Sequence, residues 1–172
     1  MARRYSSVTS SVALMHSLDV ARFREVVGHF ATGVVVITAS TPEGPVGFTC
    51  QTFGSLSINP ILISFAARTA STSWPRMRPT GTLAVNILAS HQEALARVFA
   101  TSADDKFDGF SWSPGTSGAP LLGDALATLE GNVVDVVTHG DHDIVVVAVS
   151  HVTSREGHPL LYYRGGFGTF SS

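Results

Sequence analysis

A dense group of hydroxyl and amide side chains lies between residues 49 and 57 of this sequence. The group contains Thr49, Gln51, Thr52, Ser55 and Ser57. These side chains offer neutral hydrogen-bond donors and acceptors and carry no fixed charge. Such a set suits a flat ligand with polar edges and a phosphate group. The alternative is that serine and threonine are simply common in turns and edge strands.

A second group of hydroxyls is formed by Ser71, Thr72 and Ser73. We expect a short helix from Ser71 to Arg78, with a serine cap and an interruption at Pro75. Backbone N–H groups and the dipole at a helix N-terminus favour an anion. The sequence therefore predicts a place for a phosphate at this second group.

Two histidines, His139 and His142, enclose a Gly140-Asp141 pair. Their spacing allows metal ligation, with Asp141 and Asp143 alongside, but no third ligand of convincing spacing follows. A Gly-Asp pair is also typical of a hairpin turn, in which the histidines are simply exposed. We predict a turn and no metal site.

The single cysteine, Cys50, is either a nucleophile or a small core residue. Nothing near it in the sequence lowers the pKa of its thiol, so packing is the favoured interpretation. One cysteine excludes an intrachain disulfide, which fits a reducing compartment and a cytoplasmic protein.

Common catalytic signatures are missing from the sequence. It has no Gly-x-Ser-x-Gly elbow and no Gly-Lys-Ser/Thr phosphate loop. The run Gly166-Phe167-Gly168 lacks the third glycine and the following helix of a dinucleotide-binding fingerprint. Any nicotinamide cofactor must therefore bind without a Rossmann unit.

Helices are expected at two further places in the chain. Asp19 is a plausible N-cap for a helix whose apolar stripe is formed by Val20, Phe23, Val27 and Phe30 and which ends near Gly33. The run from Ser90 to Glu93 reads as a capping box. The helix that this box opens should bury three apolar side chains, those of Leu95, Val98 and Phe99.

Strands account for most of the remaining pattern, and Val34 to Ala39 should be buried on both faces. The other expected strands are Val46–Phe53, Ile61–Ala66, Thr82–Leu88, Leu126–Thr138, Asp143–Thr153 and Leu160–Arg164. Residues 113–120 hold two prolines and two glycines and are expected to be loop. Strand follows strand through tight turns, which favours a mainly β antiparallel barrel over a doubly wound fold.

The composition narrows the class of protein. Hydrophobic residues make up 44% of the 172 residues and charged residues 14%, and the net charge is −2. No stretch of about 20 apolar residues is long enough to span a membrane, and no basic stripe indicates nucleic acid. We interpret the apolar composition as contact between subunits. Residues 1–17, rich in serine and threonine, read as a flexible leader before a single domain over 18–172.

Several separated motifs together resemble the flavin reductases that supply two-component monooxygenases. They include Phe30 to Val34, Gly47 to Pro60, Val85 to Leu88 with Gln92-Glu93, and Phe99-Ala100 with Asp105-Lys106-Phe107. The last are Gly140-Asp141-His142 and the segment from Pro159 to Gly165. The resemblance covers about Asp19 to Phe170. It implies a split β-barrel, a Greek-key antiparallel barrel with a few flanking helices, assembled as a homodimer.

The resemblance also assigns roles to individual residues. It places Thr49, Cys50, Gln51 and Thr52 along the flavin ring edge and ribityl chain, Ala66 and Ala67 along the ring, and Ser57 and Ser71 to Ser73 near the phosphate. Lys106 and Phe107 would close the outer side, and His142 would face the nicotinamide nucleotide. Many relatives carry Asn-Ser where this chain has Gln51-Thr52, which leaves the choice between FAD and FMN open.

The implied activity is reduction of FAD or FMN by NADH, with NADPH less favoured. The reduced flavin would diffuse to a flavin-dependent monooxygenase that hydroxylates an aromatic, steroid or natural-product substrate. Two other functions stay open: a non-catalytic flavin- or haem-binding split-barrel carrier or sensor, and an oxygenase that keeps its flavin. A carrier needs no nicotinamide contact, and a chain of this length leaves little room for a separate substrate pocket.

Overall fold

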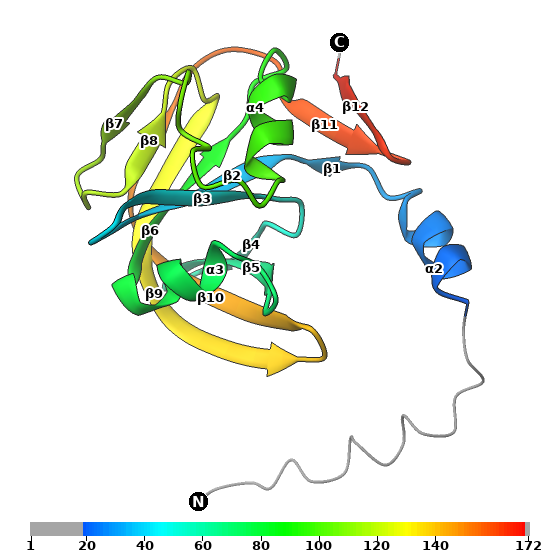
Figure 1. Ribbon diagram of the computed structural model, residues 1–172, viewed down its shortest axis with the longest axis horizontal. Helices are drawn as coiled ribbons and strands as arrows, with labels where there is room; N and C mark the ends of the chain where they lie inside the picture. The colour runs from blue at the N-terminus through cyan, green and yellow to red at the C-terminus, as the bar shows by residue number, and fades with distance from the viewer. Residues whose placement is uncertain (1–18, 171–172) are drawn as a thin grey trace, which may run out of the picture.

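The structure, a computed structural model, describes residues 19–170, so the predicted leader lies outside the described residues. Its main element is one antiparallel sheet with the strand order β3-β2-β6-β9-β10-β5-β4 (Figure 1). Its strands are β2 (Val35–Thr41), β3 (Gly44–Cys50), β4 (Gly54–Ile58), β5 (Ile61–Arg68), β6 (Thr82–Ile87), β9 (Ala127–His139) and β10 (His142–Ser154). The prediction of a mainly β antiparallel fold with few helices is confirmed.

Two small sheets complete the β structure. One joins β1 (Thr32–Gly33), β11 (Leu160–Tyr163) and β12 (Gly166–Thr169), and the other pairs β7 (Trp112–Pro114) with β8 (Pro120–Leu122). The prediction that residues 113–120 are all loop was therefore wrong at both ends. The β7–β8 hairpin packs beside the large sheet, where Thr38 Oγ1 donates to the carbonyl of Pro120.

Residues 19–170 form four short helical segments besides the strands. They are α2 (Val20–Val27), α3 (Trp74–Met77), the 3-10 turn η2 (Arg78–Thr80) and α4 (Glu93–Phe99). Asp19 caps α2 as predicted, accepting a hydrogen bond from the N–H of Ala21 at 3.0 Å. The expected end at Gly33 was wrong: Gly28 is the C-cap, and Phe30 lies beyond the helix.

The capping box predicted from Ser90 to Glu93 was also wrong. Gln92 is the residue before α4, and its side chain makes no capping bond. That side chain instead accepts a hydrogen bond from the N–H of Ala89 and donates one to the carbonyl of Gly123. The helix buries Leu95 and Phe99 as expected, but Ala96 takes the place foreseen for Val98. The amide of Gln92 thus anchors the start of α4 to the neighbouring loop.

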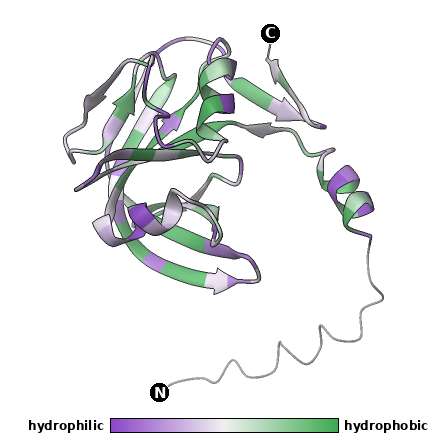
Figure 2. Ribbon diagram, viewed as in Figure 1, coloured by the Kyte–Doolittle hydropathy of each residue, from purple (hydrophilic) through white to green (hydrophobic). Residues whose placement is uncertain are grey.

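The hydrophobic core has two parts, on opposite faces of β2. Val35, Ile37 and Ala39 point into a cluster beneath β5, β10 and α3, and Val34 and Val36 point into a second cluster beneath α4. All residues from Val34 to Ala39 are at most 3% exposed, so the prediction of a strand buried on both faces is confirmed. In Figure 2 the apolar colouring runs along these central strands.

Helix α2 is set apart from the rest of the fold. It stands beside the body of the molecule, and none of its residues is buried (Figure 1). Its apolar side chains Val20, Phe23, Val26 and Val27 are 48–61% exposed. Within residues 19–170 no helix is both long and apolar enough to cross a membrane.

Candidate functional site

A cavity of about 510 Å³ lies between the end of β3, the end of β5, the C-terminus of α4 and the start of β10. Predicted site residues from distant parts of the sequence meet there. Those that line it are Thr49, Cys50, Gln51, Thr52, Ala66, Ser71, Thr72, Lys106 and His142. The volume falls within the range of about 300–1,000 Å³ typical of ligand and cofactor sites.

Four predicted residues do not line this cavity. Ala67 is 1% exposed and points into the core, because successive residues of a strand face opposite sides and Ala66 takes the cavity side. Phe107 is buried under α4, with its ring edge-on to that of Phe99. Ser57 lies on the edge strand β4, opposite Leu62. The flavin contacts predicted for these three residues stay predictions.

Ser73, the fourth residue, turns inward. Its hydroxyl donates to the carbonyl of Gly47 and accepts from the ammonium of Lys106. The helix expected after it is only four residues long. The N–H groups of Ser73 and Trp74 both donate to Ser71 Oγ at 3.2 Å, so two of the donors expected to bind an anion are already engaged.

Sequence reasoning missed several residues of the cavity wall. They are Phe48, Arg68, Ala70, Phe99, Ala100, Thr101 and Ser102. Arg68 was detectable in principle, because it ends β5 directly opposite His142 of β10. The residues from 99 to 102 reach the cavity only because α4 packs on β3. No local sequence pattern predicts this tertiary contact.

The hydroxyl groups of the wall divide into engaged and available ones. Thr49 Oγ1 donates to the carbonyl of Ala96 at 2.6 Å. Thr52 Oγ1 bonds both the N–H and the carbonyl of Ala66, which fixes β5 against the end of β3. The amide of Gln51 and the hydroxyl of Thr72 have no such partner within residues 19–170. These two groups are therefore available to a ligand.

Lys106 is the buried cation of the site. Its side chain reaches in from the loop after α4, and the residue is 5% exposed. The ammonium donates to the carbonyl of Gly47 at 3.2 Å and to Ser73 Oγ at 3.1 Å. Burial lowers the pKa of this amine from its ordinary value, Asp104 opposes that change, and Arg76 adds to it. An anionic ligand in the cavity would offset the cost of this buried charge.

Gly47 allows the close packing around this lysine. A Cβ at Gly47 would lie 2.8 Å from a ring carbon of Phe99 and 3.0 Å from the carbonyl oxygen of Ile37. Any larger residue would push α4 away from β3. The glycine therefore sets the width of the cavity on the α4 side.

His142 begins β10 and is the residue of the β9–β10 hairpin that lines the cavity. His139 is its partner across the turn and does not line it. His142 Nδ1 lies 2.8 Å from Asp141 Oδ1, which leaves Nε2 for a ligand. This hydrogen bond, together with the charge of His142, lowers the pKa of Asp141.

Cys50 lines the cavity but is buried, with 5% exposure. Its Sγ lies 3.2 Å from Thr52 Oγ1. Burial raises the pKa of the thiol, and hydrogen bonds from Thr52 and neighbouring backbone only partly oppose this rise. A protonated, buried thiol is a poor nucleophile, which supports the packing role.

The fixed charges around the cavity are positive. Among residues 19–170 no carboxylate lines it, whereas Arg68, Lys106 and the imidazole of His142 do. A neighbouring hollow near Asp104 has the opposite character and is lined by four carboxylates and one arginine. The first cavity is therefore the one suited to an anionic ligand with a neutral, hydrogen-bonding body.

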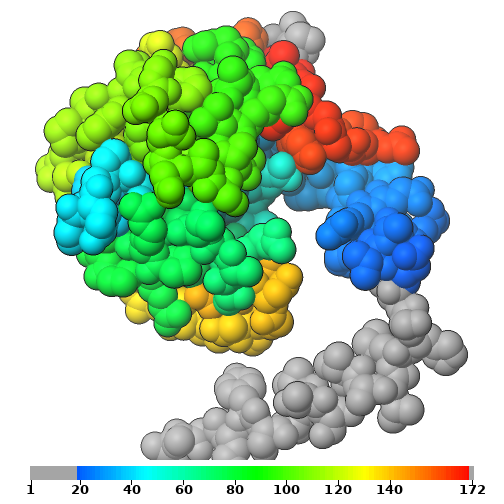
Figure 3. Space-filling view, viewed as in Figure 1, coloured from blue at the N-terminus to red at the C-terminus, as the bar shows by residue number. Residues whose placement is uncertain are grey.

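A second cavity, of about 680 Å³, adjoins the first at Gln51 and Thr52. Its far wall is formed by α2 and the β11–β12 hairpin, including Arg24, Phe30 and Arg164. Figure 3 shows the open space between α2, in blue, and the body of the molecule. Two adjoining cavities give room for two ligands that must meet.

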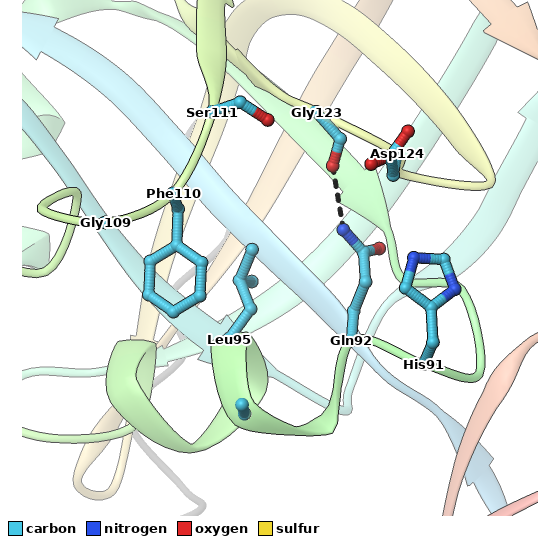
Figure 4. A pocket seen from close by; sticks show the side chains of 9 residues that line it. His91, Gln92, Leu95, Gly109, Phe110, Ser111, Gly123 and Asp124 are labelled. Carbon is cyan, nitrogen blue, oxygen red and sulfur yellow. Dashed lines mark hydrogen bonds between the residues drawn. The ribbon is translucent and has the colours of Figure 1, made fainter.

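A smaller cavity of about 220 Å³ lies on the other side of α4 (Figure 4). There the side chain of Gln92 points at the carbonyl of Gly123, and Leu95 and Phe110 fill the neighbouring space. None of the predicted site residues lines it. Within residues 19–170 no group of three or more His, Cys, Asp or Glu side chains is placed to hold a metal ion.

Comparison with known proteins agrees with this geometry. Residues 27–171 match the model of the flavin reductase like domain. The chain belongs to the flavin reductase-like family. The match spans the whole wall of the first cavity, including Thr49, Lys106 and His142.

Named relatives of this flavin reductase-like protein include reductases and monooxygenase subunits. The reductase subunit HsaB of a flavin-dependent monooxygenase from Mycobacterium tuberculosis is 38% identical over 153 residues, which cover 87% of this chain and 82% of HsaB. The FMN reductase (NADH) SmoA of Agrobacterium fabrum is 36% identical, over 87% of this chain and 85% of SmoA.

A solved structure is similar along nearly the whole chain. The NADH:FAD oxidoreductase of Streptomyces globisporus has 34% sequence identity and a TM-score of 0.84, over 92% of this chain and 98% of that one. The same oxidoreductase has also been solved in complex with NAD and FAD fragments.

Proposed function

We propose that this protein is an NAD(P)H:flavin oxidoreductase that reduces FAD or FMN and releases the reduced flavin to a partner flavin-dependent monooxygenase. The observation that carries the proposal is the first cavity. It has neutral donors along one wall, a buried lysine at one end, no carboxylate from the described part of the chain, and a second cavity adjoining it. A flavin nucleotide has the matching chemistry, with a flat polar-edged ring and a phosphate.

The side chains divide the work between binding and orientation. Gln51 and the backbone around it face the junction of the two cavities, where the two rings would meet. Lys106 and Arg68 supply positive charge for phosphate oxygens, and His142 supplies a ring nitrogen for the nicotinamide nucleotide. The two cofactors supply the hydride chemistry themselves, so the protein needs no general base. Its contribution is to hold two rings in contact and to exclude water.

The groups that line the cavity are consistent with weak binding of flavin. The hydroxyl groups of Thr49 and Thr52 already form hydrogen bonds with backbone carbonyl groups. The fixed charges that line the space are those of Lys106 and Arg68. A flavin held by charge at its phosphate and by few other side-chain hydrogen bonds can leave after reduction, as a diffusible product must.

The exposed apolar surface supports the homodimer, and the seven-stranded antiparallel sheet supports the split barrel. Helix α2 presents an uncovered apolar stripe, and Leu56, Ile58 and Ile61 project from the β4–β5 edge with 52–81% exposure. Exposed apolar side chains gathered on one element mark an interaction site when they form a patch. A symmetric dimer would cover both surfaces and would place the second cavity at or near the interface. The single buried cysteine fits a cytoplasmic location.

The competing function is a carrier or sensor that binds flavin or haem but catalyses no reaction. The cavity favours the reductase, because His142, which pairs with Arg68 across β10 and β5, lines it and suits a second, anionic nucleotide. A carrier would not need His142. The third hypothesis is an oxygenase that retains its bound flavin and hydroxylates a substrate itself. Such an enzyme would need a further pocket for an organic substrate.

Steady-state oxidation of NADH separates these functions. Purified protein is mixed with NADH and an excess of FAD or FMN, and the absorbance of NADH is followed. A reductase gives a rate that saturates in both substrates, whereas a carrier gives no rate above that of the buffer. NADPH is run in parallel, because Arg24 and Arg164 both line the second cavity and either could bind a 2′-phosphate.

A further inference from the structure

A buried carboxylate, that of Asp143, lies next to His142 in the chain but faces the other way. Along β10 the side chains of Asp143, Val145 and Val147 alternate into the interior. The Asp143 side chain is only 4% exposed. A charge in such a position costs free energy unless donors surround it. The geometry around Asp143 shows what those donors are.

Three side chains donate to this carboxylate, and each comes from a different element. Trp74 Nε1 of α3 lies 2.8 Å from Oδ2, and Arg78 of η2 lies 3.3 Å from the same oxygen. Thr138 Oγ1 of β9 lies 2.6 Å from Oδ1. The carboxylate therefore ties the β9–β10 hairpin to the helical segment that follows residues 71–73.

The other end of this link reaches the cavity wall. Trp74 is 1% exposed, and its ring lies edge-on to that of Phe65. Its backbone N–H donates to Ser71 Oγ, and the hydroxyl of the preceding residue, Ser73, accepts from the ammonium of Lys106. A shift of Trp74 that carries its backbone along would therefore disturb both the hydroxyl segment and the ammonium of Lys106.

We propose that Asp143 is a positioning residue, whose carboxylate sets the distance between His142 and the segment 71–73 across the cavity. Asp143 touches no ligand itself. It acts through Trp74 on one wall and through the strand backbone on His142. The inference rests on the proposed function, in which these two walls hold the nicotinamide nucleotide and the flavin.

Two variants test the proposal. Asp143→Asn keeps the shape of the side chain but replaces one acceptor oxygen with an amide that itself donates. Trp74→Phe keeps an aromatic ring but removes the Nε1–H. Glu130→Gln is the matched control, because Glu130 is also a buried carboxylate, and it accepts from Thr116 and Ser117, away from the cavity.

The expected result is a loss of alignment between the two ligands. Because a misplacement of about 1 Å can cost up to about a hundredfold in rate, kcat should fall roughly tenfold or more in Asp143→Asn and Trp74→Phe, and KM for flavin should rise. The double variant should lose no more than the worse single variant, since both break the same link. Glu130→Gln should lower Tm and leave KM unchanged. If the Asp143 and Trp74 variants behave as this control does, Asp143 is purely structural and the proposal is wrong.

A second readout keeps this test separate from the proposed function. Amide hydrogen exchange is measured on the protein without ligands. Asp143→Asn should speed exchange in residues 69–77 and in residues 139–144 together, whereas Glu130→Gln should affect residues 115–118. Faster exchange in only one of the first two segments overturns the positioning role. If wild-type protein reduces no flavin while both segments respond, the proposed function fails and the link between the walls stands.

Discussion

The ammonium of Lys106 and the hydroxyl of Ser73 lie 3.1 Å apart, and both groups also bond the carbonyl of Gly47. This arrangement fixes a positive charge at one end of a cavity that otherwise offers mostly neutral groups. Its three members come from β3, the segment before α3 and the loop after α4. The charge is therefore held by the tertiary fold and cannot swing away as a surface lysine would.

Replacing Lys106 with methionine should weaken flavin binding. The variant keeps an unbranched side chain in the core and removes the ammonium. A hydrogen bond to a charged group contributes about 1.5–3 kcal/mol, so KM for flavin should rise roughly tenfold or more. KM for NADH should change much less. Steady-state kinetics with each substrate varied in turn measures both constants.

The matched control for this lysine is Arg76→Met. Arg76 is a half-exposed cation nearby that pairs with Asp104 and does not line the first cavity. Its loss should leave both KM values unchanged. An equal rise in the KM for flavin from the two variants would mean that general charge, and not the Lys106 position, attracts the ligand.

His142→Ala should weaken the use of NADH and leave flavin affinity nearly unchanged. The reason is that His142 lines the cavity and its Nε2 is unengaged, since Nδ1 faces Asp141. The loss in kcat/KM for NADH should be roughly ten- to a hundredfold. His139→Ala is the control, because His139 lies across the turn and outside the cavity wall. Similar losses of kcat/KM for NADH in the two histidine variants would contradict the proposal that His142 contacts the nicotinamide nucleotide.

The protein should sediment as a dimer at micromolar concentration. Phe23 is 51% exposed on helix α2, none of whose residues is buried by the rest of residues 19–170, so Phe23→Asp should shift the mass toward that of one chain. Arg22→Ala, on the same helix and in an exposed ion pair with Glu25, should stay dimeric. A wild-type monomer that still binds flavin would contradict both the dimer and the interface location of the second cavity.

Acid should remove part of the stability of the fold through Asp143. Hydrogen bonds from Thr138 and Trp74 hold the pKa of this carboxyl below its ordinary value of 3.8. A carboxyl with a lowered folded-state pKa stabilises the fold above the unfolded-state value, and that contribution disappears as pH falls through the folded-state value. The Tm difference between wild type and Asp143→Asn should thus be largest near neutral pH and shrink below pH 3.8. A difference that stays constant across this range would show that the charge is not involved.

Local patterns in the sequence predicted much of the framework. The N-cap at Asp19, the doubly buried strand around Val36 and the hairpin between His139 and His142 follow from short-range rules, and all three are confirmed. The strand β12 was missed because Gly166 and Gly168 give it no apolar alternation. The hairpin of β7 and β8 was missed because its prolines read as loop, although packing against Thr38 holds it as a small sheet.

The candidate site was predicted less completely because side-chain direction depends on tertiary contacts. Resemblance to the family grouped Gln51, Lys106 and His142, and all three line one cavity in the structure, while their roles stay predictions. Ser73 was grouped with Ser71 because both are serines. Only the tertiary fold determines that Ser71 lines the cavity, whereas the hydroxyl of Ser73 bonds Gly47 and Lys106 in the interior. Asp143 looked like a possible metal ligand, whereas Trp74, far away in the sequence, is its partner.

The most direct test of the account counts the flavin molecules that each chain reduces. Purified protein, NADH and a large excess of FAD or FMN are mixed under anaerobic conditions, and the loss of oxidised flavin absorbance is followed to completion. We predict that each chain reduces many equivalents of flavin, until NADH or flavin is exhausted. Reduction that stops at one equivalent of tightly held flavin per chain would contradict it.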